Sequence, residues 1–198
     1  PRQPRGLYVS GARRCVSETA RYYHAAGAGG VAVGVHTTQF EIREHGLLRP
    51  VLELAAEVSR ATAAGDAPAG SLHTGPRPLV QVAGAAGDVR QAVAEAELAA
   101  SLGYDAVLLA PRVPGLAGSR EEVERVLLDR ARAVGEVLPV IGFYLQEAIG
   151  GPRLSVGFWR EYASIEAVVA IPAAPGPRGR RGGADQPARP AADGVPRA

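Results

Sequence analysis

Short apolar runs alternate with amphipathic stretches along the chain. Five runs of five residues are mostly continuous rather than alternating, with Gln81 as the single polar interruption, which is typical of strands in a parallel sheet covered on both faces. The five predicted strands are Val31–Val35, Leu79–Ala83, Ala106–Ala110, Pro139–Phe143 and Ala167–Ile171. An amphipathic stretch separates each consecutive pair, so the pattern predicts a repeating strand–helix unit.

The amphipathic stretches carry helix periodicity. Helices are predicted near Val16–Ala26 and over 47–64, 88–102, 120–134 and Leu154–Ala163. For the helix over 47–64 the spacing predicts one buried face, made of Leu47, Val51, Leu54, Val58 and Ala61.

Capping residues sharpen two of these helix boundaries. Asp88 is a predicted N-cap with Gln91 three residues later, and Gly103 is the predicted residue just past the end of that helix. Ser119 and Glu122 spell a capping box at the start of the next helix.

The strand–helix rhythm requires parallel strands joined by right-handed crossovers. Two architectures fit: an open doubly wound sheet, and a (β/α)8 barrel with units missing, since a full barrel takes roughly 250 residues. We expect an α/β fold, an incomplete (β/α)8 TIM barrel with about five parallel strands. The expected divisions are an irregular segment over 1–15, the partial barrel over 16–171 and a disordered tail over 172–198.

The amino-acid composition excludes several kinds of catalytic and metal-binding site. All 22 basic residues among the 198 are arginines, and the sequence has no lysine, methionine or asparagine, which indicates a GC-rich bacterial coding sequence. A lysine Schiff base is therefore excluded for the chain as written. The single cysteine, Cys15, excludes an internal disulfide and a multi-cysteine zinc site. We expect a cytoplasmic protein with no membrane span, no metal and no cofactor.

The last 27 residues differ from the rest. They hold six prolines, five glycines, five arginines and two aspartates, with one valine as the only large apolar residue. Such a segment cannot bury enough apolar surface to offset the entropy of ordering, so the tail is predicted to be disordered. Its arginines could contact nucleic acid, but it has no aromatic residue on which bases could stack, and we do not expect nucleic-acid binding.

Four segments, in order, resemble one family. Gly30–Gln39 resembles a strand and turn with paired threonines, and Pro78–Gly84 with the helix reaching Asp105 resembles the unit that follows. Pro139–Tyr144 resembles a strand ending in a catalytic tyrosine, and Glu166–Ile171 one ending in a Schiff-base lysine. The set is similar to the dihydrodipicolinate synthase / N-acetylneuraminate lyase family of pyruvate-dependent class I aldolases. The resemblance implies a (β/α)8 barrel, usually in homo-oligomers, that acts on a small keto acid.

The resemblance also implies site residues. Thr37 and Thr38 match the paired threonines, and Tyr144 matches the tyrosine that relays protons. The lysine position is occupied by Pro172, and Ile149 stands where a carboxylate-binding arginine is common. Because the family-like sequence stops at Ile171, we hypothesise a truncated or frameshifted member that is a lyase by resemblance and inactive in this form.

Simpler interpretations stay open. The threonine pair could cap a turn, and Tyr144 could be a core residue with its hydroxyl at the rim. His36 and His45 make a weak zinc signal, and His24 is expected at the surface. Gly84 and Gly87 lie before a helix, where backbone N–H groups could hold an anion. The alternative function is therefore a non-catalytic α/β domain that binds a small anion or a protein partner.

Overall fold

The computed structural model describes residues 17–35, 41–64, 79–111, 113, 115–144 and 151–172. Five parallel strands form one sheet, and each strand pairs with the next along the chain. The strands are β1 (Gly30–Val33), β2 (Val80–Ala85), β3 (Ala106–Leu109), β4 (Val140–Ile141) and β5 (Val168–Ala170).

A helix covers residues 17–25 before β1, and one helix follows each of the first four strands. These four helices are α2 (Leu48–Ala63), α3 (Val89–Ser101), α4 (Arg120–Gly135) and α5 (Val156–Ser164). All five predicted strands and the predicted helices are therefore confirmed. The largest difference is β4, which has two residues instead of five, at a point where its register with β5 shifts. The predicted irregular segment over 1–15 lies outside the described residues, as does the predicted tail over 172–198 apart from Pro172.

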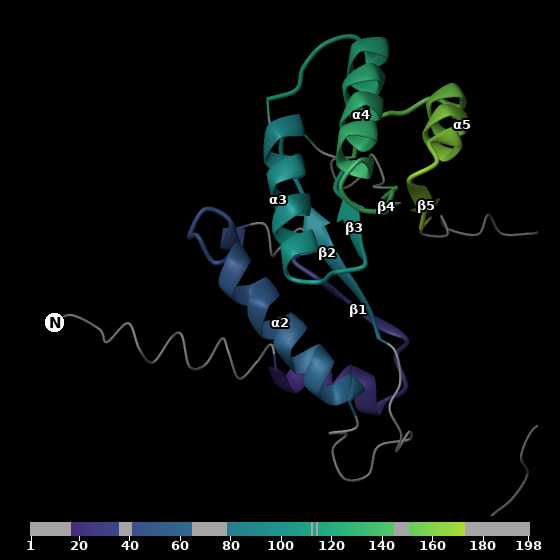
Figure 1. Ribbon diagram of the computed structural model, residues 1–198. Helices are drawn as coiled ribbons and strands as arrows, with labels where there is room; N and C mark the ends of the chain where they lie inside the picture. The colour runs from purple at the N-terminus through teal and green to yellow at the C-terminus, as the bar shows by residue number, and fades with distance from the viewer. Residues whose placement is uncertain are drawn as a thin grey trace, which may run out of the picture.

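The strand order decides between the two architectures. A doubly wound sheet reverses its order at a switch point, whereas this sheet runs β1-β2-β3-β4-β5 without reversal. Right-handed crossovers between such strands bring every helix to the same face of the sheet. Figure 1 shows α2, α3, α4 and α5 following one another around the strands in chain order. The fold is the expected incomplete (β/α)8 barrel, and the doubly wound alternative is wrong.

Both predicted caps are present. The Asp88 carboxylate accepts the backbone N–H of Gln91 at 2.8 Å, which satisfies one free donor at the start of α3. At the start of α4 the Ser119 hydroxyl accepts the Glu122 N–H, and the Glu122 carboxylate accepts the Ser119 N–H at 2.8 Å. Gly103 has a φ of +79°, which lets it end α3 in the left-handed region.

The buried face of α2 differs from the predicted one. Val58 is buried as predicted, but Leu47 is 43% exposed and Ala61 is exposed. The buried set lies mainly one residue further along: Leu48, Leu52, Ala55, Ala56, Val58, Ser59 and Thr62. Small residues at 55, 56, 59 and 62 allow close packing, whereas a hydrophobicity pattern weights the larger leucines and valines. The apolar residues of this helix cover a wide arc of its surface. Periodicity alone therefore predicted a buried face that is rotated from the observed one.

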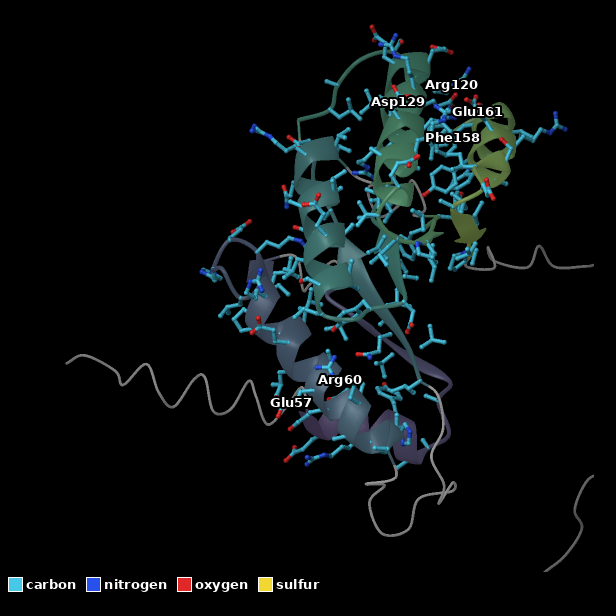
Figure 2. The ribbon with its side chains drawn as sticks, in the orientation of Figure 1. Glu57, Arg60, Arg120, Asp129, Phe158 and Glu161 are labelled. Carbon is cyan, nitrogen blue, oxygen red and sulfur yellow. The ribbon has the colours of Figure 1, made fainter. Side chains whose placement is uncertain are left out.

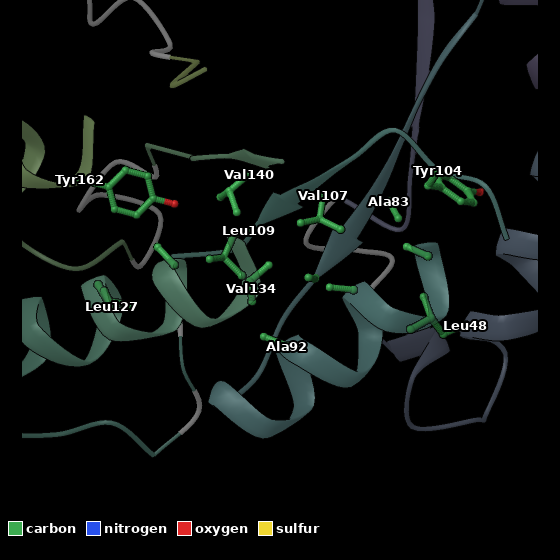
Figure 3. Packing of buried hydrophobic residues seen from close by; sticks show 14 of the residues in the cluster. Leu48, Ala83, Ala92, Tyr104, Val107, Leu109, Leu127, Val134, Val140 and Tyr162 are labelled. Atoms are coloured by element: carbon green, nitrogen blue, oxygen red, sulfur yellow. The ribbon is translucent and has the colours of Figure 1, made fainter. Parts of the chain in front are cut away.

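The core lies between the helices and the face of the sheet that they cover. Phe158 is buried on α5 and lies between α5 and α4 (Figure 2). Figure 3 shows Leu109 of β3 beside Val134 of α4, with Val140 of the next strand nearby. The central strands are buried most, while the edge strands are more exposed, with Val169 of β5 at 61%. Within the described part of the chain, no helix is long and apolar enough to cross a membrane.

Tyr104 ties α2 to the strand that follows α3. Its hydroxyl is buried and donates to the Leu52 carbonyl oxygen at 3.0 Å. Burial raises the pKa of Tyr104 well above its usual value, and Arg60 opposes this shift only partly. Burial likewise raises the pKa of Tyr162 to about 12.

We predict that Tyr104→Phe lowers the free energy of unfolding by about 1 kcal/mol at pH 7, the net value of one hydrogen bond. The folded protein keeps the Tyr104 proton above pH 10 and the unfolded chain releases it, so the wild type loses stability as the pH rises beyond 10. The variant loses less over this range, because it has no phenol at position 104 that must stay protonated in the folded state. Urea unfolding at pH 7 to 11 measures both effects, with the exposed Tyr22→Phe as control. Parallel pH profiles of wild type and Tyr104→Phe would contradict the assignment.

Candidate active site

The carboxyl ends of β4 and β5 bring two of the predicted site positions to one edge of the sheet. Ile141 pairs with Ala170, and the Gly142 N–H donates to the Ala170 carbonyl oxygen at 2.8 Å. Tyr144 follows Gly142 by two residues, and Pro172 follows Ala170 by two residues. Parallel pairing therefore carries both to the same edge, where barrel enzymes hold their catalytic residues.

The Tyr144 ring packs against the helical layer. Its centroid lies 5.8 Å from that of Trp159 on α5, in an edge-to-face arrangement that is favourable for aromatic rings. Trp159 also contacts Phe158 and Tyr162 edge to face, and the rings of Phe158 and Tyr162 pack against each other at a tilt. Tyr144 therefore extends an aromatic cluster. Tyr144 is 37% exposed. The Tyr144 side chain lies at the rim of the sheet, partly packed against α5 and partly exposed to solvent.

Thr37 and Thr38 lie outside the described residues, as do His36 and Ile149. The segments on either side of the threonines are described. Gly34 follows β1 at the carboxyl edge, and Arg43 comes back to it from the far side of the loop. One Arg43 nitrogen lies 3.5 Å from the Gly34 carbonyl oxygen and the other lies 3.0 Å from that of Gly84. Arg43, which follows the threonine segment, is therefore held against the residue after β1 and against β2.

A buried ion pair fixes Arg43. Its Nε and Nη2 donate to the two carboxylate oxygens of Glu95 at 2.8 Å each, and the side chains are only 10% and 9% exposed. A bidentate pair of this kind has the geometry in which charge-assisted hydrogen bonds are strongest. It links the loop after β1 to the middle of α3.

Glu95 also binds the turn before α3. Its carboxylate accepts the Ala86 backbone N–H at 3.0 Å and the Gln91 side-chain amide at 2.9 Å. The Ala86 amide, which an anion could have used, is thus already bonded to the protein. Gly84 is required for close approach here, since a Cβ on it would lie 2.1 Å from the Gly34 carbonyl oxygen. The glycines therefore serve chain packing at this turn.

Arg130 of α4 contacts the same edge of the sheet, where β2 and β3 end. It is 1% exposed, and it donates to the Gly87 carbonyl oxygen at 2.7 Å and to the Ala110 carbonyl oxygen. These carbonyls follow β2 and β3, so Arg130 joins the two strand ends. Burial lowers the pKa of Arg130 to about 10, which leaves it charged at neutral pH.

Sequence reasoning missed Arg43, Glu95 and Arg130, although two of them carried a signal. Glu95 falls between Ala92 and Ala96 on the buried face of α3, and Arg130 falls between Leu127 and Val134 at helical spacing on α4. A charged residue on an apolar helix face usually has a buried partner. Arg43 had no such signal, because its position depends on how a loop folds back.

Of the two histidines that the structure describes, one lies where the sequence analysis placed it and the other does not. His24 is 1% exposed, so its predicted surface position is wrong. It lies on the helix over 17–25, and that helix packs one face inward. His45 is exposed beside Glu44, as predicted for a solvated segment. Among the described residues, no group of three histidine, cysteine or acidic side chains is placed to hold a metal ion.

Solved structures provide the comparison with known proteins. The chain matches dihydrodipicolinate synthase from Agrobacterium tumefaciens with a TM-score of 0.59 and 24% identity, over 80% of this chain and 47% of that one. It matches N-acetylneuraminate lyase from Fusobacterium nucleatum with a TM-score of 0.58 and 17% identity, over 80% and 48%. Dihydrodipicolinate synthase from Bacillus clausii matches with a TM-score of 0.59 and 14% identity, over 78% and 44%. No family model matches the sequence, and a search of curated proteins finds no match.

These matches confirm the expected resemblance at the level of the fold. The chain has the fold of part of the dihydrodipicolinate synthase and N-acetylneuraminate lyase structures, and it spans about half the length of each. At identities below 25%, these matches show a shared fold and do not show that the chemistry is shared.

We predict that Glu95→Gln lowers the free energy of unfolding by about 3–5 kcal/mol, because it leaves the buried Arg43 cation without its counter-charge. The matched control is Glu161→Gln, which breaks the exposed pair with Arg132 at 2.6 Å and should cost far less. Urea unfolding of both variants makes the comparison. Equal losses would mean that the Arg43–Glu95 pair contributes no more than a surface pair.

Proposed function

We propose that the chain is part of an aldolase-type lyase barrel that binds a small keto acid at the carboxyl edge and does not form a Schiff base in its present form. One observation carries the proposal: Tyr144 and Pro172 follow neighbouring strands at the same edge. That is the arrangement a lysine imine and a proton-transferring tyrosine would need. Thr37 and Thr38, on the loop held by Arg43, would orient the tyrosine.

The chemistry lacks its nucleophile. In imine formation a primary amine attacks the keto carbon and water leaves, so the substrate becomes linked through nitrogen. The sequence contains no lysine, and Pro172 has no side-chain amine. A phenol such as Tyr144 can move protons during this reaction but cannot replace the amine. We therefore propose that the chain as written is inactive in imine chemistry. Assembly into homo-oligomers stays a prediction.

We predict that Pro172→Lys restores imine formation with pyruvate. The new amine would stand beside Tyr144, and borohydride would trap the imine as a stable secondary amine. The matched control is Val169→Lys, which places an amine on the same strand at an exposed position before the edge. Adding Tyr144→Phe to Pro172→Lys should slow trapping by on the order of 100-fold, the contribution of one positioned acid–base group.

Peptide mass spectrometry locates each adduct and separates it from adducts on the Pro1 amine. Equal trapping at positions 172 and 169 would contradict a keto-acid site at this edge and favour the alternative of a non-catalytic domain. Trapping at 172 that ignores Tyr144→Phe would contradict only the role of the tyrosine. An adduct on an internal side chain of the wild type would contradict inactivity.

A further inference from the structure

The inner face of the sheet, opposite the helices, is apolar along all five strands. Val107, Leu109 and Val140 belong to the core under the helices. Val33 and Val168 pack against the same core. Side chains alternate between the two faces of a strand, and the pairing register aligns equivalent positions from strand to strand. The side chains that point to the inner face are therefore those of Ala32, Val80, Val82, Ala106, Leu108, Ile141 and Val169.

Solvent exposure on this inner face is greatest at its two sides. Val80 of β2 is 52% exposed and Ala32 of β1 is exposed, while Val169 of β5 is 61% exposed. Leu108 and Ile141, on the strands between, are half-buried. Single exposed apolar residues are normal on a protein surface, but these belong to one face that no charged side chain of the five strands interrupts. A continuous apolar face of this kind is typical of a protein contact surface.

The sheet also ends in two open strand edges. Among the described residues, β1 pairs only with β2, and β5 pairs only with β4. The Gly29 carbonyl oxygen accepts the Val80 N–H at 3.0 Å. Because the backbone groups of successive residues point to opposite sides of a strand, those of Gly30 and Ala32 point away from β2. A row of backbone groups at a sheet edge can accept another strand, so the apolar face has an open edge on either side.

A second copy of this chain matches both features at once. Its inner face is apolar in the same way, and its sheet ends in the same two edges. Rotation about a twofold axis that runs along the strands places β1 of each copy beside β5 of the other, with all strands parallel. This arrangement removes both open edges, as the closure of a barrel does. It also covers the two sides of the face, where exposure is greatest.

We propose that two copies of this chain associate through the inner face and the outer strands β1 and β5, forming a closed dimer. Five strands about four residues long and about 4.8 Å apart give a face of about 24 Å by 13 Å. The two faces with their strand edges bury on the order of 1,000 Å² in total, the lower limit for a specific interface, which corresponds to a weak and reversible dimer. This inference does not depend on the keto-acid site proposed at Tyr144 and Pro172.

Sedimentation velocity of the full chain measures the association between about 1 µM and about 200 µM, a range that brackets a micromolar dissociation constant. We expect a reversible monomer–dimer equilibrium without larger species. Val80→Glu and Val169→Glu each place a carboxylate in the contact, and burial of an unpaired charge should weaken the dimer by about 100-fold or more. Val156→Glu is the matched control. Val156 is 68% exposed on α5, away from the inner face, so the dissociation constant should not change.

Three outcomes overturn the proposal: a chain that stays monomeric over the whole range, assemblies that keep growing with concentration, and a dimer that keeps its affinity in both sheet variants. If the glutamate variants do not fold, the reactivity of an introduced thiol decides. In a Cys15→Ser background, Val169→Cys should react with iodoacetamide several-fold more slowly at the highest concentration than at the lowest, whereas Val156→Cys should react equally at both. Equal rates for Val169→Cys contradict the proposal, because its side chain would then stay open to solvent.

Discussion

The parallel pairing of strands in chain order is the constraint on which everything else depends. Because β1 to β5 all run in one direction, their carboxyl ends meet at a single edge. Because every crossover is right-handed, the helices occupy one face and leave the other for the interior of a barrel. Tyr144 and Pro172 follow neighbouring strands at this edge for this reason, although 28 positions separate them in the sequence. The fold thus brings these two positions to one edge without any direct bond between them.

Two buried arginines contact carbonyl oxygens at that edge, and they differ in how the protein compensates their charge. Arg43 donates to the carbonyl oxygen of Gly84, near the carboxyl end of β2. Arg130 donates to the carbonyl oxygens of Gly87 and Ala110, which come just after β2 and β3. A guanidinium suits this task because its planar fork reaches two acceptors at once. Arg43 brings its counter-charge from inside the protein, through Glu95. Among the residues that the structure describes, no carboxylate forms an ion pair with Arg130, whose guanidinium is held by backbone carbonyl oxygens instead.

The sequence predicted the elements well and the contacts poorly. Continuous apolar runs gave the five strands, and the caps at Asp88 and Ser119 marked where two helices begin. These features are local, so the letters around them suffice. The buried face of α2 was partly missed because small residues, which pack most closely, score weakly in a pattern of hydrophobicity. The Arg43–Glu95 pair spans 52 positions, and only the closed loop after β1 brings its partners together.

Fold and chemistry in this chain rest on different residues. The packing of the barrel segment depends on buried residues between the sheet and the helices, such as Val107, Leu109 and Val134. Imine chemistry would depend on one amine just beyond β5, and Pro172 stands there without contributing to the core. A residue without an amine at this position provides no nucleophile and leaves the strand pairing unaffected, because β5 ends two residues earlier. A chain can therefore match the solved lyase structures over most of its length while lacking the group that their resemblance would lead one to expect. The same separation makes Pro172→Lys informative, since it changes the chemistry and leaves the core as it is.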